Sequence, residues 1–576
     1  MSTTTTATVI VKNAKITTMN SQCPEASCLA VADGKFLAVG NAQDVAPYEA
    51  ASTQVIDAKG HRLIPGLNDS HIHGIRQGLN YSMELRWDAQ TSLSEALFLL
   101  TEQAKRTPPG QWVRVVGGWS YNQFAEHRHP TIDEINKATV DVPAYVLHLY
   151  DYAIINKAGL KLLGFDKASK DVFPRGRIIR DASGNPTGMF IAVPSAVILY
   201  SLLNMLPKLD EDEAYLSSQH FMKEMNRFGV TSFLDAGGGF LNYPDDYGVV
   251  RKLHSEGKMT TRIGFNLFAQ KAGKELEDFE RWTEAFKPDE GDAMLKINGA
   301  GEMLRASAYD FEDFILPRMD FGPNMEDELF EVVDLLARKR WPFRFHATYD
   351  ESATRILNVL EMVHREYPLN GLNWIFDHGE TLKEHNIERI AKMGGGISVQ
   401  NRIAFQEVQF LDRYGADAAN DAPPLKKIME MGVPLGNGTD ATRVSSYNPW
   451  QSIHWTVSGK GMGGMTLIGD KNRLDRHTAL KLYTDNAWFS REDNVKGRIE
   501  PGLLADFTVL SEDYFSIEED AIRDLESVLT VLDGKIVYGK GPFSSLAPAD
   551  LPELAEWTPV KHYGGFVRPA KEALLV

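Results

Sequence analysis

An apolar segment leads directly into two histidines in the stretch Leu63-Ile64-Pro65-Gly66-Leu67-Asn68-Asp69-Ser70-His71-Ile72-His73. Side chains at positions i and i+2 of a strand point to the same face, so His71 and His73 can reach one ion. Two histidines at a polar loop edge would give the same pattern, and such a pair alone is a weak signal. Its position directly after an apolar strand favours a metal site.

Seven further candidate strands follow, separated by helical patterns. They span residues 229–235, 261–268, 293–298, 342–347, 373–377, 395–400 and 433–438. Repeated strand–helix units indicate a parallel sheet, and eight units indicate closure. The sequence therefore predicts an α/β fold built on a (β/α)8, TIM-like barrel.

Residues of metal-ligand type also occur in four of these later strands. His346 and His378 stand at strand ends, Lys296 is flanked by apolar residues, and Asp440 follows the glycine-rich segment before it. Each alone has a simpler explanation: a hydrogen-bonded core histidine, a salt-bridged lysine or a turn aspartate. Because the imidazoles recur at independent strand ends, we expect a catalytic metal site of the zinc type. Asp440 is expected both to bind the metal and to accept a proton from water.

The two ends of the chain carry short valine-rich segments joined by turns. Asp33-Gly34 and Asp533-Gly534 have the composition of hairpin turns, in which glycine tolerates positive φ. We expect residues 1–62 and 496–543 to pair into one small β-sandwich and residues 63–495 to form the barrel. Residues 544–576 form a C-terminal extension.

A long insertion, residues 74–220, separates the first two barrel strands. Loops at the carboxyl ends of barrel strands build active sites, so the insertion is a candidate substrate lid. Trp119, Tyr121 and Phe124 are expected to line an apolar wall of the site, with packing inside the lid as an equally good explanation.

Composition limits the partners. The 576 residues carry a net charge of −17, which argues against nucleic acid and makes a neutral or cationic small molecule the more plausible substrate. No stretch resembles a membrane helix or a secretory signal, and only Cys23 and Cys28 are present. We expect a cytoplasmic protein without membrane association, and we leave a homodimer open.

Several motifs together resemble a known family. They are Pro65-Gly66-Leu67-Asn68-Asp69-Ser70-His71-Ile72-His73, Pro109-Gly110-Gln111-Trp112-Val113, Gly229-Val230-Thr231-Ser232, Asp235-Ala236-Gly237-Gly238, Gly438-Thr439-Asp440-Ala441 and Gly502-Leu503-Leu504-Ala505-Asp506-Phe507. The chain resembles the amidohydrolase superfamily, in the branch of the N-substituted formamide deformylases. The resemblance implies a barrel with a β-sandwich, and one or two divalent ions, usually zinc. It also implies the ligands His71, His73, His346, His378 and Asp440, and a carboxylated Lys296 if two ions bind.

The chain departs from the branch at its substrate-facing positions. Asp151 stands where relatives carry the histidine of an Asp-Gly-His run. The sixth-strand motif is Asp377-His378-Gly379-Glu380 instead of Glu-His-Ala-Gln, and Gln400-Asn401 replaces Gln-Pro. These changes put the substrate in doubt, and Asp151 becomes a candidate substrate contact.

The expected activity is metal-dependent hydrolysis of an amide-type C–N bond in a small organic molecule, with Asp440 as general acid and base. Two alternatives remain. Hydrolytic deamination on the same fold would normally need a His-x-x-Glu spacing that His346 lacks. A non-catalytic scaffold would be expected to have lost its ligands.

Overall fold

The structure is a computed structural model that describes residues 5–169, 176–192, 196–310, 314 and 321–566. Parts of four predicted units fall outside these ranges: residues 1–4 of the N-terminal segment, 170–175 and 193–195 of the insertion, 311–313 and 315–320 of the barrel, and 567–576 of the C-terminal extension.

All eight strands predicted for the barrel are present, in two parallel sheets. One sheet has the order β16-β15-β14-β8 and contains β8 (Leu67–Ile72), β14 (Val230–Asp235), β15 (Arg262–Leu267) and β16 (Leu295–Ala300). The other has the order β17-β18-β19-β20 and contains β17 (Arg344–Ala347), β18 (Ile375–His378), β19 (Gly396–Gln400) and β20 (Leu435–Gly438). Nearly every residue of these strands is buried, as expected for parallel strands covered on both faces.

The two sheets touch along both pairs of edge strands. Ala300 of β16 forms a parallel bridge with Phe343, just before β17. At the other edge, the backbone N–H of Asp440 donates to the carbonyl oxygen of His71 at 2.8 Å. Gly438 is required there, because a Cβ at this position would lie 2.6 Å from the His71 nitrogen.

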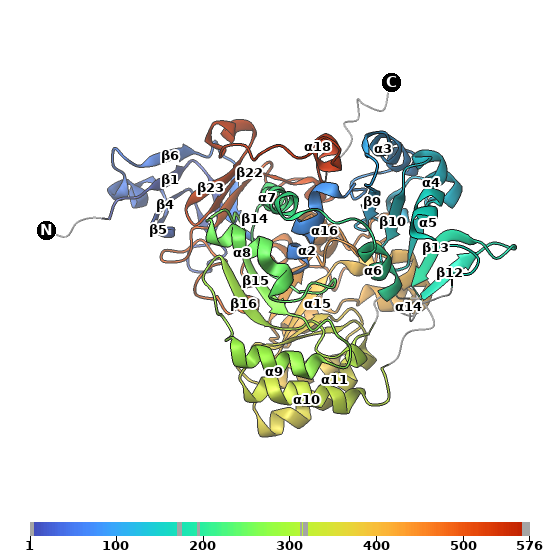
Figure 1. Cartoon of the computed structure of the whole chain (residues 1–576). Helices are drawn as coiled ribbons and strands as arrows, with labels where there is room; N and C mark the ends of the chain where they lie inside the picture. Colours follow the sequence, from blue (N-terminus) through green and yellow to red (C-terminus); the bar gives the residue numbers. More distant parts are fainter. Residues whose placement is uncertain (1–4, 170–175, 193–195, 311–313, 315–320, 567–576) are drawn as a thin grey trace.

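Amphipathic helices cover the outer faces of these strands (Figure 1). In α10 (Met325–Arg338), for example, Leu329, Val332, Val333 and Leu336 are buried, which is the spacing of one helical face. The other covering helices are α7 (Glu211–Arg227), α8 (Gly248–Ser255), α9 (Glu275–Ala285), α11 (Asp350–Glu366), α12 (Glu384–Lys392), α14 (Glu407–Asn420), α15 (Leu425–Glu430) and α16 (Pro449–Ser458).

Strands from both ends of the chain share one sheet. Its order is β23-β22-β21-β7-β2-β3, with β2 (Lys15–Thr17), β3 (Glu25–Ala26), β7 (Arg62–Pro65), β21 (Phe507–Leu510), β22 (Ser527–Leu532) and β23 (Lys535–Gly539). A second sheet has the order β5-β4-β1-β6, with β1 (Val9–Lys12), β4 (Cys28–Ala32), β5 (Lys35–Gly40) and β6 (Gln54–Asp57). Val11 and Val31 of the second sheet share a buried cluster with Phe507 and Val531 of the first, and Figure 1 draws these blue and red segments together.

The insertion has its own sheet and helices, in the upper right of Figure 1. The sheet order is β12-β13-β11-β10-β9, with β9 (Val113–Val116), β10 (Ala144–His148), β11 (Tyr152–Ile155), β12 (Gly176–Arg180) and β13 (Pro186–Ala192). Its helices are α3 (Leu93–Arg106), α4 (Ile132–Thr139), α5 (Lys157–Leu163) and α6 (Val197–Asn204). The described part of the C-terminal extension ends on the outside of α7, where Arg227 donates to the carbonyl oxygen of Phe566 at 2.7 Å.

Candidate metal centre

The structure brings four of the predicted histidines and Asp440 together. His71 lies within β8 and His73 directly after it, while His346 and His378 lie near the ends of β17 and β18. Asp440 follows β20 by two residues, and its Oδ1 lies 3.3 Å from Nε2 of His71 and 3.2 Å from Nε2 of His73. Carboxyl ends of adjacent parallel strands meet at one edge, which explains the convergence.

A second carboxylate, Glu302, lies in the middle of this cluster. Glu302 follows β16 by two residues, and its Oε2 lies 3.3 Å from Nδ1 of His346 and 3.4 Å from Nε2 of His378. Its carboxylate is also 3.7 Å from Nε2 of His71 and 3.7 Å from Nε2 of His73. The sequence analysis missed Glu302, although it obeys the same rule as the histidines: a ligand-type residue at the carboxyl end of a strand.

Lys296 does not join the cluster, and the prediction that it would do so is wrong. Because β16 spans Leu295–Ala300 and not the predicted 293–298, Lys296 lies near the start of its strand instead of its end. Its ammonium group donates to the Ser490 carbonyl at 2.9 Å and lies 3.2 Å from carboxylate oxygens of both Asp289 and Glu492. The Lys296 side chain is therefore engaged by two carboxylates and a carbonyl at the end of β16 opposite to the cluster.

Neighbouring groups fix the orientation of three imidazoles. Nδ1 of His71 lies 2.9 Å from Asp377, which Arg344 also contacts through its Nε at 2.6 Å. Nδ1 of His73 lies 2.6 Å from the carbonyl oxygen of Gly237. Contacts of this kind hold one ring nitrogen as a donor and turn the other toward the centre of the site.

His346 is held the other way round. Its Nε2 lies 3.2 Å from the carboxylate of Asp310, while its Nδ1 faces Glu302. Asp310 itself accepts the backbone N–H groups of Thr348 and Tyr349. The sequence offered no signal for Asp310, because it lies in a loop far from any predicted strand end.

The cluster has a strongly polarised electrostatic environment. Burial alone would raise the pKa of Glu302, but the charge of His71 and the contacts with His346 and His378 hold that pKa well below its usual value. Asp440 is buried too, and the neighbouring His71 and His73 side chains keep its pKa well below the usual range. Burial opposes the charge of His71, yet Asp377 and Glu302 raise its pKa to about 10. The same carboxylates would attract a metal cation to this position.

The donor set fits a divalent metal. Two groups of three have their ligand atoms within 4.8 Å of one another: His71, His73 and Asp440, and His71, Glu302 and His378. All of these side chains are buried, and Nε2 of His71 and Nδ1 of His378 have no hydrogen-bond partner among the described residues. Imidazole nitrogens and carboxylate oxygens are the donors that zinc prefers.

Two of the five converging residues have left-handed backbone conformations. His378 has a φ of 79° and Asp440 a φ of 52°. Such conformations are unfavourable for side chains larger than glycine and occur mainly where a site needs a particular side-chain direction. In both cases the turn directs a polar side chain into the cluster.

Two of the three residues predicted for the aromatic wall lie in the core of the insertion. Trp119 and Phe124 are 0% exposed and stack on each other with ring centroids 5.5 Å apart. The Trp119 indole N–H donates to the Leu147 carbonyl at 2.9 Å, and these contacts correspond to the packing explanation. Tyr121 is half-buried and packs on His129 with centroids 4.0 Å apart, so its place in a substrate wall stays a prediction.

Asp151 lies between the insertion and the metal cluster. Its carboxylate is 3.0 Å from Nδ1 of His148 and 3.4 Å from the Gln406 amide nitrogen. Gln406 accepts a hydrogen bond from Arg402 at 3.1 Å, and Arg402 approaches Asp440 at 4.0 Å. Arg402, which sequence reasoning missed, therefore connects Asp151 to the cluster.

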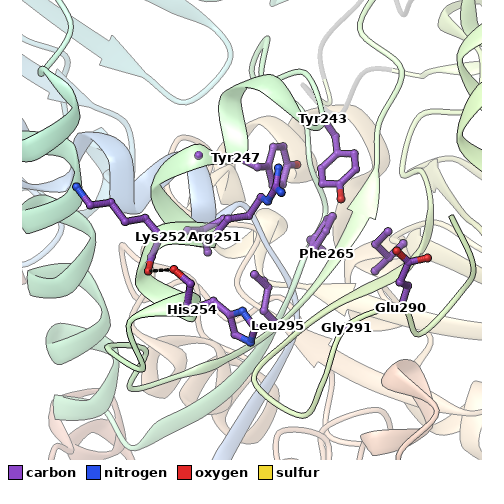
Figure 2. Close-up of a pocket in the computed structure, with 13 residues that line it drawn as sticks. Tyr243, Tyr247, Arg251, Lys252, His254, Phe265, Glu290, Gly291 and Leu295 are labelled. Atoms are coloured by element: carbon purple, nitrogen blue, oxygen red, sulfur yellow. Dashed lines mark hydrogen bonds between the residues drawn. The ribbon is translucent and has the colours of Figure 1, made fainter. Parts of the chain in front are cut away.

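A separate cavity of about 530 Å³ lies on the outer side of β15 and β16, beside α8. Figure 2 shows Tyr243, Tyr247, Phe265 and Leu295 lining it, with Arg251 and Glu290 among the polar groups. None of the cluster residues lines this cavity, so it does not belong to the candidate metal centre.

The comparisons with known proteins agree with this geometry. The sequence profile described as "Amidohydrolase family" matches residues 54–538. YtcJ of Bacillus subtilis (strain 168) is 26% identical over 538 residues, covering 91% of this chain and 98% of that protein. The N-substituted formamide deformylase of Arthrobacter pascens is 22% identical over 546 residues, covering 92% and 98%.

Solved structures show the same fold. An uncharacterized metal-dependent hydrolase from Pyrococcus horikoshii OT3 superposes with a TM-score of 0.64 at 20% identity, covering 89% of this chain and 99% of that one. A mutant of the atrazine chlorohydrolase TrzN from Arthrobacter aurescens TC1, complexed with zinc and atraton, gives a TM-score of 0.52 at 11% identity, covering 92% and 95%.

Fold and site together define a hydrolase with a buried cluster of histidines and carboxylates at the carboxyl ends of parallel strands. The chain belongs to the amidohydrolase family. Within the described residues, no helix combines the length and the apolar character needed to cross a membrane.

Proposed function

We propose that this protein hydrolyses an amide-type C–N bond in a small organic molecule, with one or two divalent ions, zinc by preference, at the cluster. The observation that carries the proposal is the convergence of His71, His73, His378, Glu302 and Asp440 from four different strand ends. His71, His73 and Asp440 would hold one ion. Glu302, His346 and His378 would hold a second, with Glu302 in the role that the family resemblance implied for a carboxylated Lys296.

A divalent ion at this position supplies Lewis acidity for a carbonyl oxygen and lowers the pKa of water to ~7. The protein's own groups perform the proton transfers. Asp440 is ionised at neutral pH, because the neighbouring His71 and His73 side chains lower its pKa despite burial. Its carboxylate can therefore take a proton from the attacking water and return it to the leaving nitrogen.

Arg402 supports Asp440 in this role. Its guanidinium lies 4.0 Å from Oδ2 of Asp440, on the side away from the two histidines that face Oδ1. The arginine thus restrains the carboxylate while one oxygen stays directed at the reacting groups. Asp377 and Gly237 keep His71 and His73 in the orientation that presents Nε2.

The proposal includes the architecture that supports the site. The bridge between Ala300 and Phe343 and the hydrogen bond from Asp440 to His71 support closure of the eight strands into one (β/α)8 barrel. The shared core of the two terminal sheets supports a β-sandwich formed by both chain ends. In this arrangement residues 63–495 form the barrel and residues 74–220 cover its mouth.

The test compares the wild type with Asp440→Asn on a panel of formamides, acyl amino acids and cyclic amides. We expect chelation to abolish hydrolysis and zinc to restore it. Asp440→Asn should lower kcat by about 10²–10⁴-fold, the range for loss of a general acid–base, while at least one ion stays bound. Wild-type rates in Asp440→Asn would remove Asp440 from the proton-transfer role.

Product analysis separates the remaining alternatives. Hydrolysis of a substituted amide releases an amine and an acid, whereas a deaminase releases ammonia. If no member of the panel is turned over and elemental analysis finds no bound metal, the scaffold explanation replaces the proposal.

A further inference from the structure

Three buried arginines meet in one pocket next to the candidate metal centre. The pocket has a volume of about 190 Å³, and its lining includes Arg76, Arg114, Arg443 and Tyr200. A space of this size lined by three guanidinium groups suits a small polar group better than a large apolar one.

These arginines differ from the other buried arginines of the protein. Of the eight arginines that are buried, five have a carboxylate oxygen within 4.0 Å, for example Arg86 with Asp88 at 2.9 Å and Arg262 with Asp506 at 2.7 Å. Within the described residues, the three without such a partner are the three that line this pocket. Their clustering points to a common missing partner.

Each of the three arginines has a nitrogen atom without a hydrogen-bond partner among the described residues. These buried donors are Nη2 of Arg76, Nε of Arg114 and Nη1 of Arg443. Arg76, Arg114 and Arg443 are only 5%, 3% and 8% exposed. Burying a cation without a counter-charge is costly, so such groups are normally paired.

The cations also lie close to one another. The guanidinium carbons of Arg76 and Arg443 are 5.7 and 4.3 Å from the centre of the same Tyr200 ring. Arg76 also donates to the Tyr200 hydroxyl at 3.3 Å. Together with burial, the charge of Arg76 lowers the pKa of Arg443. Two like charges on one aromatic ring favour a negatively charged group between them.

Acidic residues near the pocket do not pair with these arginines at contact distance; Asp235 and Asp440 act on Arg76 only through their charge from further away. Asp246 is the one carboxylate among the lining residues; it is exposed and accepts the backbone N–H of Asn242 at 2.7 Å. Glu84 is buried but is already paired with Arg86 at 3.3 Å and with the Gln77 amide at 2.9 Å. Lys208 adds a further positive charge at the exposed rim.

The pocket is connected to the metal centre through the chain itself. Arg76 follows His73 by three residues, and Arg443 follows Asp440 by three residues. A Cβ at Gly239 would lie 2.3 Å from the Arg76 side chain, and one at Gly238 would lie 3.8 Å from the His73 ring. The segment that holds His73 therefore also forms a wall of the arginine pocket.

We propose that the pocket binds the anionic group of the substrate, so that the substrate is an N-acylated compound carrying a carboxylate or another small oxyanion. A guanidinium presents two parallel N–H donors that match the oxygens of such a group. Arg76 and Arg443 are the specificity-determining residues, and Tyr200 positions them. The inference rests on the proposed amide hydrolysis and adds its substrate class.

The first test compares N-formyl-phenylalanine with its neutral carboxamide, N-formyl-phenylalaninamide. We expect the wild type to prefer the acid by at least about 30-fold in kcat/KM, within the range for one or two charge-assisted hydrogen bonds. Arg443→Gln and Arg76→Gln should each lose at least about 10-fold on the acid and less than about 3-fold on the amide. The matched control is Arg281→Gln, a surface arginine paired with Asp278, which should change neither value.

The second test measures binding without turnover. Benzoate and inorganic phosphate should each raise the Tm of the zinc-loaded wild type, and comparison of the two separates carboxylate from phosphate recognition. Arg443→Gln should lose this response, and its Tm without anion should equal or exceed that of the wild type, because the substitution removes a buried charge. This measurement also establishes that the variant is folded; if Arg443→Gln does not fold, Arg76→Gln carries the test.

The outcomes are distinguishable. A preference for the amide, or equal rates with no anion-dependent rise in Tm, overturns the inference. An anion-dependent rise in Tm that requires Arg443, without hydrolysis of either compound, supports the pocket and contradicts the amide hydrolysis.

Discussion

Replacing Glu302 with glutamine should weaken metal binding by at least about a thousandfold. Four imidazole nitrogens lie 3.3, 3.4, 3.7 and 3.7 Å from the Glu302 carboxylate, so any ion shared by these groups lies close to this charge. Removing a unit negative charge about 4 Å from a cation costs about 4 kcal/mol per unit of cationic charge at an effective dielectric constant of 20, which is the minimum for a divalent ion. That energy corresponds to about 10³-fold in affinity.

The assay titrates zinc into metal-free protein in the presence of a competing chelator and measures bound zinc per chain. Glutamine has the shape of glutamate, so Glu302→Gln should fold and keep its neighbours in place. We expect tight sites to be lost in Glu302→Gln and retained in Lys296→Arg, because Lys296 pairs with Asp289 and Glu492 away from the cluster. Unchanged zinc affinity in Glu302→Gln would refute the reasoning. Loss of zinc in Lys296→Arg would refute it too, because arginine keeps the positive charge but cannot be carboxylated, and the loss would show that a carboxylated Lys296 is needed.

Two further predictions concern stability. Burial raises the pKa of Glu407 from 4.5 to about 7, so the folded state binds this proton more tightly than the unfolded chain does. The free energy of unfolding should therefore fall by up to about 3 kcal/mol as pH rises from 4.5 to 7. Urea unfolding at pH 5 and pH 8 should show this loss in the wild type but not in Glu407→Gln; an equal loss in both would contradict it. Arg344→Met leaves Asp377 buried without the arginine and should lower the free energy of unfolding by about 3–5 kcal/mol in the same assay. The control Lys105→Met removes an exposed pair with Glu102 and should change the free energy of unfolding by no more than about 0.5 kcal/mol. An Arg344→Met protein as stable as the wild type would exclude a structural role for the buried pair.

The apolar periodicity predicted the positions of the strands well but their ends less well. The error in the bounds of β16 led to the wrong choice of ligand, Lys296 instead of Glu302. The apolar pattern around Lys296 fits a strand at 293–298 or, as observed, Leu295–Ala300. A shift of two residues keeps the same side chains on the same face but moves Lys296 from the carboxyl end to the start. It also brings Glu302 to the position where a ligand belongs. Family resemblance favoured the lysine, whereas the rule applied to the other strand ends would have favoured the glutamate.

Other parts of the site depend on contacts that sequence cannot supply. Aromatic residues such as Trp119 and Phe124 are equally suited to the wall of a substrate site and to the core of the insertion. Only the observed stacking of the two rings identifies the core. The net charge of −17 suggested neutral or cationic substrates, yet Arg76 and Arg443 create a local cationic pocket. Overall charge describes the surface as a whole and averages over such a cavity.

The pairing of β7 with β21 has a consequence for how the protein is made. Phe507 lies opposite Pro65 in this antiparallel pair, although more than 400 residues separate them in the chain. Gly66 alone separates β7 from β8, the strand that contains His71. On the ribosome, β7 can pair with β2 early, but its other edge gains β21 only when synthesis is nearly finished. Nascent chains must keep an unpaired β-edge shielded for most of translation, which makes this protein a natural client for chaperones.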